Sequence, residues 1–246
     1  MRIPDRERAA HRAAFRAMSL AQKAEYVFAY YKLPLVLALV AAVALGSVAH
    51  RMLTYREPVL YVAYVNVVPG DEVGMRLTTG FLDRVGADPK TSEVLCYQGL
   101  YLSDEASQQD HQYAYASKLK LMAAVDAEQL DVVLMNRDAY DLLSASGYLL
   151  DLHDACADDA ALLGSLGPHL VSNMVILSDN SVEVELGATD EYVAESVESA
   201  NAVDVTTACT LDALSGDEPL YLGVIANTPR GDASLDYVAY VLGAGV

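Results

Sequence analysis

The chain beyond residue 56 alternates between apolar runs typical of buried strands and stretches with helical spacing. Runs rich in β-branched and aromatic residues predict strands at 58–67, 93–102, 130–135 and 219–226. Apolar residues spaced three and four apart predict helices at 72–85, 105–126, 137–146 and 232–242. Because strand and helix alternate three times, we expect an α/β domain whose mostly parallel sheet has helices on both faces.

Residues 153–217 break this alternation and are rich in acidic residues. The strict alternation of Val182–Leu186 predicts a strand with one solvent-exposed face, whereas 190–201 has helical spacing and 202–208 looks extended. We expect this insert to form a small second lobe. The first lobe then consists of residues 57–152 and 218–246.

A long apolar segment precedes the α/β region. Residues 33–49 contain no charged side chain, and 33–53 would span about 31 Å as a helix, close to the roughly 30 Å of a bilayer's hydrocarbon core. The pattern Ser19-Leu-Ala-Gln22 resembles a capping box that starts a helix shortly before this segment. We therefore predict a transmembrane helix at 33–53.

The distribution of charge predicts the orientation of that helix. Residues 1–32 hold seven of the chain's 16 Lys and Arg but three of its 34 Asp and Glu. The positive-inside rule makes 1–32 a basic cytoplasmic segment and places 54–246 outside a single-pass cell-membrane anchor. Two alternatives are a cleaved signal peptide, for which Ser47-Val48-Ala49 would be the cleavage site, and a helix buried in the core.

The outer domain is strongly acidic. The whole chain has a formal net charge of −18 and no basic face is visible in the sequence, which argues against nucleic acid as a partner. It has three cysteines, Cys96, Cys156 and Cys209, with no Cys-x-x-Cys pair. At most one internal disulfide can form, and we expect unpaired, buried cysteines instead.

Two segments carry a resemblance to a known family. LDVVLMNRDAYDLLSASGYLLDL at 130–152 and YLGVIANTPRGDASLDYVAYVLG at 221–243 resemble type 2 extracellular solute-binding proteins. The resemblance covers about 57–152 and 218–246, and it implies a binding-protein fold for a solute. The order of anchor and first strand is also similar to single-pass membrane proteins of Gram-positive bacteria without an established activity.

In a sheet of this type, ligands bind beyond the carboxyl ends of the parallel strands. The polar residues expected there are Asn66, Tyr101, Asn136, Arg137 and Asn227. Their neutral donors and acceptors suit sugars, peptides or similar polar ligands, although Asn residues at such positions also cap helices and shape turns.

These features predict a non-enzymatic module that binds a small polar solute or peptide and that partners a membrane transporter or envelope protein. The alternative is an envelope interaction protein that uses the fold without a small ligand.

A serine enzyme that interacts with penicillin is a more distant alternative. Ser117–Lys120 fits S-x-x-K and Ser178–Asn180 fits S-D-N, but Lys-Thr-Gly is missing. No cofactor is expected. The acidic cluster of Asp151, Asp154, Asp158 and Asp159 lacks EF-hand spacing and is interpreted as helix starts, with weak calcium binding as an alternative.

Overall fold

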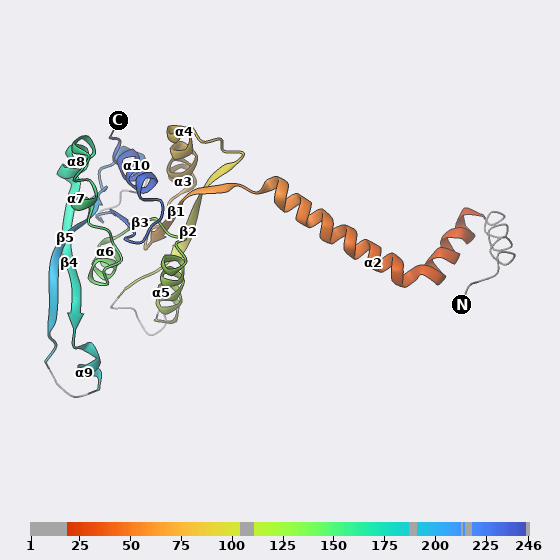
Figure 1. Ribbon diagram of the computed structural model, residues 1–246, viewed down its shortest axis with the longest axis horizontal. Helices are drawn as coiled ribbons and strands as arrows, with labels where there is room; N and C mark the ends of the chain where they lie inside the picture. Colours follow the sequence, from red (N-terminus) through yellow and green to blue (C-terminus); the bar gives the residue numbers. More distant parts are fainter. Residues whose placement is uncertain (1–18, 104–110, 187–190, 213, 215–217, 245–246) are drawn as a thin grey trace. The chain divides into compact units, whose positions relative to one another are not determined.

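The structure is a computed structural model that describes residues 19–103, 111–186, 191–212, 214 and 218–244 (Figure 1). The chain divides into two compact units, Met1–Tyr55 and Arg56–Val246. The first contains a single long described helix, and the second contains the sheet.

The long helix, α2 (Leu20–Thr54), begins at the residue after Ser19, as the capping-box pattern predicts. Its apolar side chains are exposed, including Leu37 at 61% and Leu45 at 71%. Among the described residues, no helix is both long enough and apolar enough to cross a membrane. The basic positions of 1–18 lie outside the described residues.

The second unit is an α/β domain built on one six-stranded sheet. The strands are β1 (Glu57–Val65), β2 (Ser92–Leu100), β3 (Val132–Met135), β4 (Leu170–Asp179), β5 (Ala194–Asp204) and β6 (Tyr221–Val224). Their order across the sheet is β2-β1-β3-β6-β5-β4. The predicted apolar runs became β1, β2, β3 and β6, and the whole of β3 and β6 is buried.

The sheet is mixed, so the expectation of a mostly parallel sheet is wrong for half of it. β1 pairs in parallel with β2 and β3, whereas β6, β5 and β4 pair antiparallel in succession. The connection from β5 to β6 explains why these two strands are antiparallel. A parallel neighbour needs a long crossover, usually helical, whereas the described part of this connection contains one short 3₁₀ turn, η3 (Cys209–Leu211).

Helices cover both faces of the sheet. They are α3 (Asp71–Met75), α4 (Phe81–Val85), α5 (His111–Asp126), α6 (Arg137–Ala145), α7 (Leu152–Ala155), α8 (Ala160–Leu166), α9 (Ser181–Glu185) and α10 (Gly231–Leu242). A π-helical turn, η1 (Arg76–Gly80), joins α3 to α4, and a 3₁₀ turn, η2 (Gly167–His169), follows α8.

Alternate residues of β1 enter two separate cores. Tyr64 packs on one face in the core that contains Phe81 and Tyr237, whereas Val65 packs on the other face with Leu121 and Tyr140. The two aromatic rings of Phe81 and Tyr237 meet edge to face with centroids 4.9 Å apart. Successive side chains of β1 point to opposite faces of the sheet, and both faces are buried. The helices α4 and α10 therefore cover one face, and α5 and α6 cover the other.

Residues 153–217 do not form the expected second lobe. They add β5 and β4 to the edge of the same sheet, and the two strands form a long ribbon, called here the β4–β5 ribbon (170–204), with α9 near its tip (Figure 1). Val182–Leu186, expected as a strand, belongs largely to α9, and the expected helix at 190–201 is mostly β5. The spacing of Val193 and Val197 imitates a helical turn, but pairing with β4 decides the structure.

Candidate functional site

The carboxyl ends of β1, β2 and β3 are joined by one asparagine. Asn66 follows β1 with a positive φ of 59°, a conformation that Asn tolerates better than most residues. Its Nδ2 donates hydrogen bonds to the Leu102 carbonyl oxygen at 2.6 Å and to Asn136 Oδ1 at 2.9 Å. Its Oδ1 accepts one from the Leu102 amide at 2.8 Å. Asn66 therefore links the three strand ends.

Asn136 is the N-cap of α6. Its Oδ1 accepts a hydrogen bond from the Ala139 amide at 3.2 Å in addition to the one from Asn66. The structure thus brings the predicted residues Asn66 and Asn136 together beyond the parallel strands. Most of their polar atoms are engaged in these internal hydrogen bonds, and a direct role in ligand binding stays a prediction.

Arg137 and Tyr101 also lie at this edge. The Arg137 Nε lies 3.0 Å from an Asp141 carboxylate oxygen, and its guanidinium lies 5.7 Å from the centre of the Tyr221 ring. Tyr101 stacks on Tyr113 of α5, with ring centroids 6.3 Å apart. Both side chains therefore contact neighbouring parts of the domain.

Asn227 does not join the other four residues. β6 runs antiparallel to β3, with Tyr221 opposite Met135 and Val224 opposite Val132. Asn227, which follows β6, therefore lies at the opposite edge, where its Nδ2 donates to the Val125 carbonyl at 2.9 Å. The start of β6 supplies Tyr221 to the carboxyl edge instead.

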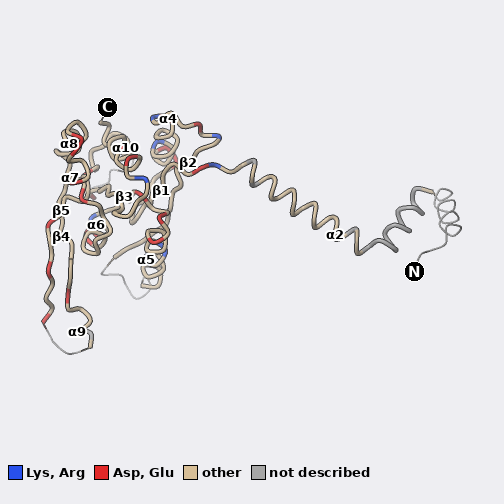
Figure 2. Tube along the Cα trace, viewed as in Figure 1, with Lys and Arg blue, Asp and Glu red and all other residues tan. Residues whose placement is uncertain are grey.

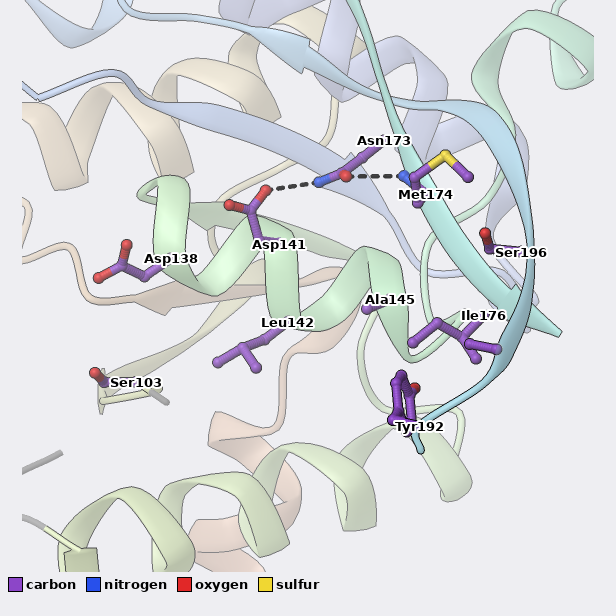
Figure 3. A pocket seen from close by; sticks show the side chains of 11 residues that line it. Ser103, Asp138, Asp141, Leu142, Ala145, Asn173, Met174, Ile176, Tyr192 and Ser196 are labelled. Carbon is purple, nitrogen blue, oxygen red and sulfur yellow. Dashed lines mark hydrogen bonds between the residues drawn. The ribbon is translucent and has the colours of Figure 1, made fainter. Parts of the chain in front are cut away.

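A groove of about 760 Å³ lies beside this edge, between α6 and the β4–β5 ribbon (Figure 3). We call it the α6 groove. Its lining residues come from α6, from the two ribbon strands and the residues just before β5, and from the segment after β2: Ser103, Asp138, Asp141, Leu142, Ala145, Asn173, Met174, Ile176, Tyr192, Ala194 and Ser196. The lining mixes carboxylates, hydroxyls and an amide with apolar side chains.

One hydrogen bond connects the two walls of the groove. Asn173 Nδ2 on β4 donates to Asp141 Oδ1 on α6 at 2.7 Å, as Figure 3 shows. The same carboxylate also holds Arg137, so its position is fixed from both sides. Asp138 presents an exposed carboxylate one turn earlier in α6. These acceptors favour ligands that donate hydrogen bonds or carry positive charge.

The charge around the groove is one-sided. No Lys or Arg occurs between Arg137 and Arg230. Figure 2 accordingly shows several acidic positions on β5, one at the end of β4, and no basic ones on either strand. An anionic ligand would meet an unfavourable potential here.

A smaller hollow of about 200 Å³ lies between α5 and α6. Apolar side chains such as Leu121 and Met122 line it, together with Lys118. Ser103 and Leu142 line both hollows. The concave surface therefore continues from the ribbon, past α6, to α5.

The motifs with catalytic spacing have structural roles here. Ser117 is buried within α5. Asn180 closes the end of the ribbon, because its Oδ1 accepts from the Val193 amide and its Nδ2 donates to the Glu191 carbonyl, both at 2.8 Å. The Ser181 hydroxyl and amide and the Tyr192 hydroxyl donate to Asp179 and lower the pKa of its carboxyl.

Two members of the acidic cluster at 151–159 cap helices. Asp151 Oδ1 accepts from the Asp154 amide at 3.0 Å, and its Oδ2 accepts from the Ser199 hydroxyl at 2.7 Å and the Ala200 amide at 3.2 Å. Burial opposes ionisation of Asp151, but these hydrogen bonds outweigh it and lower its pKa. Asp159 caps α8 in the same way. Ligand atoms of Asp151, His153 and Asp154 lie within 4.8 Å of one another, yet both Asp151 oxygens already accept hydrogen bonds, Oδ1 from the helix start and Oδ2 from β5.

The three cysteines are free thiols, as expected, but the expectation that they are buried is correct only for Cys156. Cys156 is buried, Cys96 is half-buried and Cys209 is exposed. Burial raises the pKa of the Cys96 and Cys156 thiols, which makes them poor nucleophiles.

Comparison with protein-family models, curated proteins and solved structures found no match to this chain. The resemblance to solute-binding proteins therefore stays a prediction, and the geometry of the α6 groove carries the functional argument.

Proposed function

We propose that the domain binds a small polar solute or short peptide in the α6 groove, on the outer side of a membrane to which residues 33–53 anchor the chain. The observation that carries the proposal is the groove itself. Its volume of about 760 Å³ falls within the range typical of small-molecule sites. Carboxylate, amide and hydroxyl groups alternate there with apolar surface, as in sites that orient a polar ligand.

The charge of the groove narrows the ligand class. Asp138 and Asp141 supply carboxylate oxygens, and the surrounding 92-residue stretch between Arg137 and Arg230 contains no Lys or Arg. A ligand with an amine or several hydroxyl groups can donate to these oxygens. Amino compounds, sugars and short peptides with a free amino group are therefore the expected ligands.

The anchor is supported by the sequence of α2. Residues 33–49 are uncharged, the preceding segment is basic, and the side chains of Leu37, Val40 and Leu45 are exposed on the helix. Exposed apolar surface on every side of a helix is compatible with a lipid environment. The domain beyond Tyr55 then works outside the cell.

A ligand screen on the full-length protein in detergent tests the proposal. Amines, amino acids, sugars and short peptides are compared for their effect on the thermal midpoint of unfolding. Ala145→Phe fills the groove from α6, and Ala123→Phe places the same side chain on an exposed position of α5 as a matched control. We expect a stabilising compound whose effect disappears in A145F and persists in A123F. A response that survives in A145F, or no response to any compound, contradicts the proposal.

A second candidate function has its own supporting observation. The β4–β5 ribbon exposes Leu177, Tyr192 and Val193, each by more than half of its surface. Exposed apolar side chains on a projecting element are typical of a protein interaction surface. An envelope interaction protein is therefore the alternative.

A further inference from the structure

We propose that β5 accepts an extended basic segment of a partner protein as an additional strand, along residues 194–199. This inference goes beyond ligand binding in the α6 groove, because it depends on the backbone edge of the ribbon and not on the groove. It commits to a protein segment in which Lys or Arg alternates with apolar residues.

The outer edge of β4 is covered by α6. The Tyr140 hydroxyl donates to the Val171 carbonyl at 3.1 Å, and the Ser144 hydroxyl donates to the Met174 carbonyl at 3.3 Å. Asn173 Oδ1 accepts from the Met174 amide at 2.8 Å. Side chains thus satisfy the β4 edge as far as Met174, which protects it from pairing with another chain.

The β5 edge is covered over a shorter length. Among the described residues, β5 pairs with β6 only at Val203 and Asp204. The Ala200 amide, on the same side of the strand, donates to Asp151 Oδ2 at 3.2 Å. Pairing with β6 and the hydrogen bond to Asp151 therefore cover the β5 edge only between Ala200 and Asp204.

Strand geometry identifies the next open positions on that edge. In an antiparallel ladder the amides of alternate residues point to the same side. A β-bulge between Ser199 and Ala202 interrupts this alternation, so Glu198 and Ser196 are placed from their own partners on β4, Met174 and Ile176, and their amides point away from β4. Met174 lies opposite Glu198, and its amide is bonded to Asn173 instead of to β5, which identifies this as a pair without ladder hydrogen bonds. The side chains of Ser196 and Glu198 are exposed.

Around residues 194–199 the ribbon consists of two strands, because β5 pairs there with β4 and not with β6. Two strands alone are marginally stable in water, and a third strand would bury further surface. Val197 is 47% exposed and Val193 is 59% exposed. An added strand would bring apolar side chains against Val197 and supply hydrogen-bond partners for Ser196 and Glu198.

Charge selects the partner. Glu195 and Glu198 are exposed on β5, and the chain has no Lys or Arg between Arg137 and Arg230. The Ser178 hydroxyl donates to Glu195 at 3.5 Å. Neither the Glu195 nor the Glu198 carboxylate forms an ion pair with Lys or Arg among the described residues. Two copies of the ribbon would repel each other, whereas a strand with Lys or Arg on the face of Glu198 and apolar side chains on the opposite face, against Val197, would be attracted.

Binding of a labelled peptide to the full-length protein, in nanodiscs of zwitterionic lipid, tests the proposal by fluorescence anisotropy. The probe is a short peptide in which Lys and Val alternate. A second probe has the same sequence but carries N-methyl groups on its Val amides, which keeps the charge and blocks one hydrogen-bonding edge. We expect the N-methylated peptide to bind about tenfold more weakly.

Protein variants separate the edge from simple charge attraction. Ser196→Pro removes an outward amide and Glu198→Lys reverses a charge, and each should weaken binding about tenfold. Ile176→Pro removes the opposite amide on the β4 edge, and Asp126→Lys reverses an exposed charge on α5; both controls should bind within about twofold of the natural chain. Circular dichroism checks that the proline variants fold.

If the unmodified and the N-methylated peptides bind the natural chain equally well, that result alone overturns the proposal. Equal loss in E198K and D126K would also overturn it, because general acidity would then explain the attraction. A145F, which fills the α6 groove, should leave peptide binding unchanged. A loss of small-ligand binding in A145F with intact peptide binding would support both proposals separately.

Discussion

Asn66 Nδ2 and Asn136 Oδ1 lie 2.9 Å apart and join the ends of two parallel strands. The two residues are far apart in the sequence, yet each follows a strand directly. The same Asn66 amide group also binds the Leu102 carbonyl beyond β2. This contact fixes the start of α6, and with it the wall of the groove.

Replacing Asn66 should destabilise the domain for two separable reasons. Asn66→Gly keeps the positive φ but leaves the buried Leu102 amide without its acceptor, and it should cost about 2 kcal/mol. Asn66→Ala adds the strain of an alanine in the left-handed region, about 1 kcal/mol more. Urea unfolding followed by circular dichroism measures both, since the chain has no Trp. Equal losses in the two variants would show that backbone conformation is unimportant here.

The buried Asp131 depends on Arg230. Asp131 is fully buried, and its Oδ2 accepts from Arg230 Nε at 2.8 Å and from the Tyr61 amide at 2.7 Å. Arg230→Met would leave the carboxylate without its cation, at a cost of about 3 kcal/mol. The double variant Asp131→Leu with Arg230→Met removes both charges and should recover at least part of that loss, as a double-mutant cycle by urea unfolding would show. Additive losses would contradict this interpretation.

Asp151 should make the stability of the domain depend on pH. Its pKa is lowered in the folded chain, so its contribution is complete above the ordinary Asp value of about 4 and is lost as pH falls through the lower folded value. Asp151→Asn should therefore destabilise the protein by about 1 kcal/mol at neutral pH, and the difference from the natural chain should shrink in acid. The exposed neighbour Asp158 provides the control variant, Asp158→Asn, which should not change the profile. A difference that persists unchanged at low pH would rule out this role.

Cysteine labelling tests the proposed orientation. Cys209 is exposed, whereas Cys156 is buried and the Cys96 thiol is half-buried 3.4 Å from the Tyr64 hydroxyl. A membrane-impermeant maleimide should label the natural chain in intact cells and should fail to label Cys209→Ser.

The matched variant moves the thiol to the other side. Ser19→Cys in the Cys209→Ser background should be labelled only after permeabilisation, because residues 1–32 are proposed to be cytoplasmic. Protection of Cys209 until the cells are opened would exclude an outer location for the domain.

Local patterns were sufficient for the elements with strong local signals. β1, β3 and β6 carry unbroken apolar runs, and Asn136 stands immediately before α6 as an N-cap. Gly147 stands directly after the helix predicted at 137–146 and ends it. It has a φ of 71°, and the Tyr148 amide donates to the Leu143 carbonyl at 3.2 Å, as in a Schellman motif.

Strand direction and the groove depended on distant contacts. The apolar run of β6 indicates burial, but only its neighbours β3 and β5 determine that it runs antiparallel, and this moves Asn227 away from the expected site. Asp138 directly follows the predicted residues Asn136 and Arg137, and Asp141 lies about one helical turn further along α6. Their opposite wall comes from β4, for which no strand was predicted, so the groove could not be derived from the sequence.

The position of β6 has a consequence for how the domain is made. It is the last described strand along the chain, yet it separates β3 from β5 in the middle of the sheet. A newly synthesised chain therefore carries two unfinished half-sheets until Tyr221–Val224 emerges, and unpaired strand edges in that interval invite aggregation. Substitutions in the connection before β6 should accordingly reduce the yield of folded protein more than they reduce the stability of molecules that have already assembled.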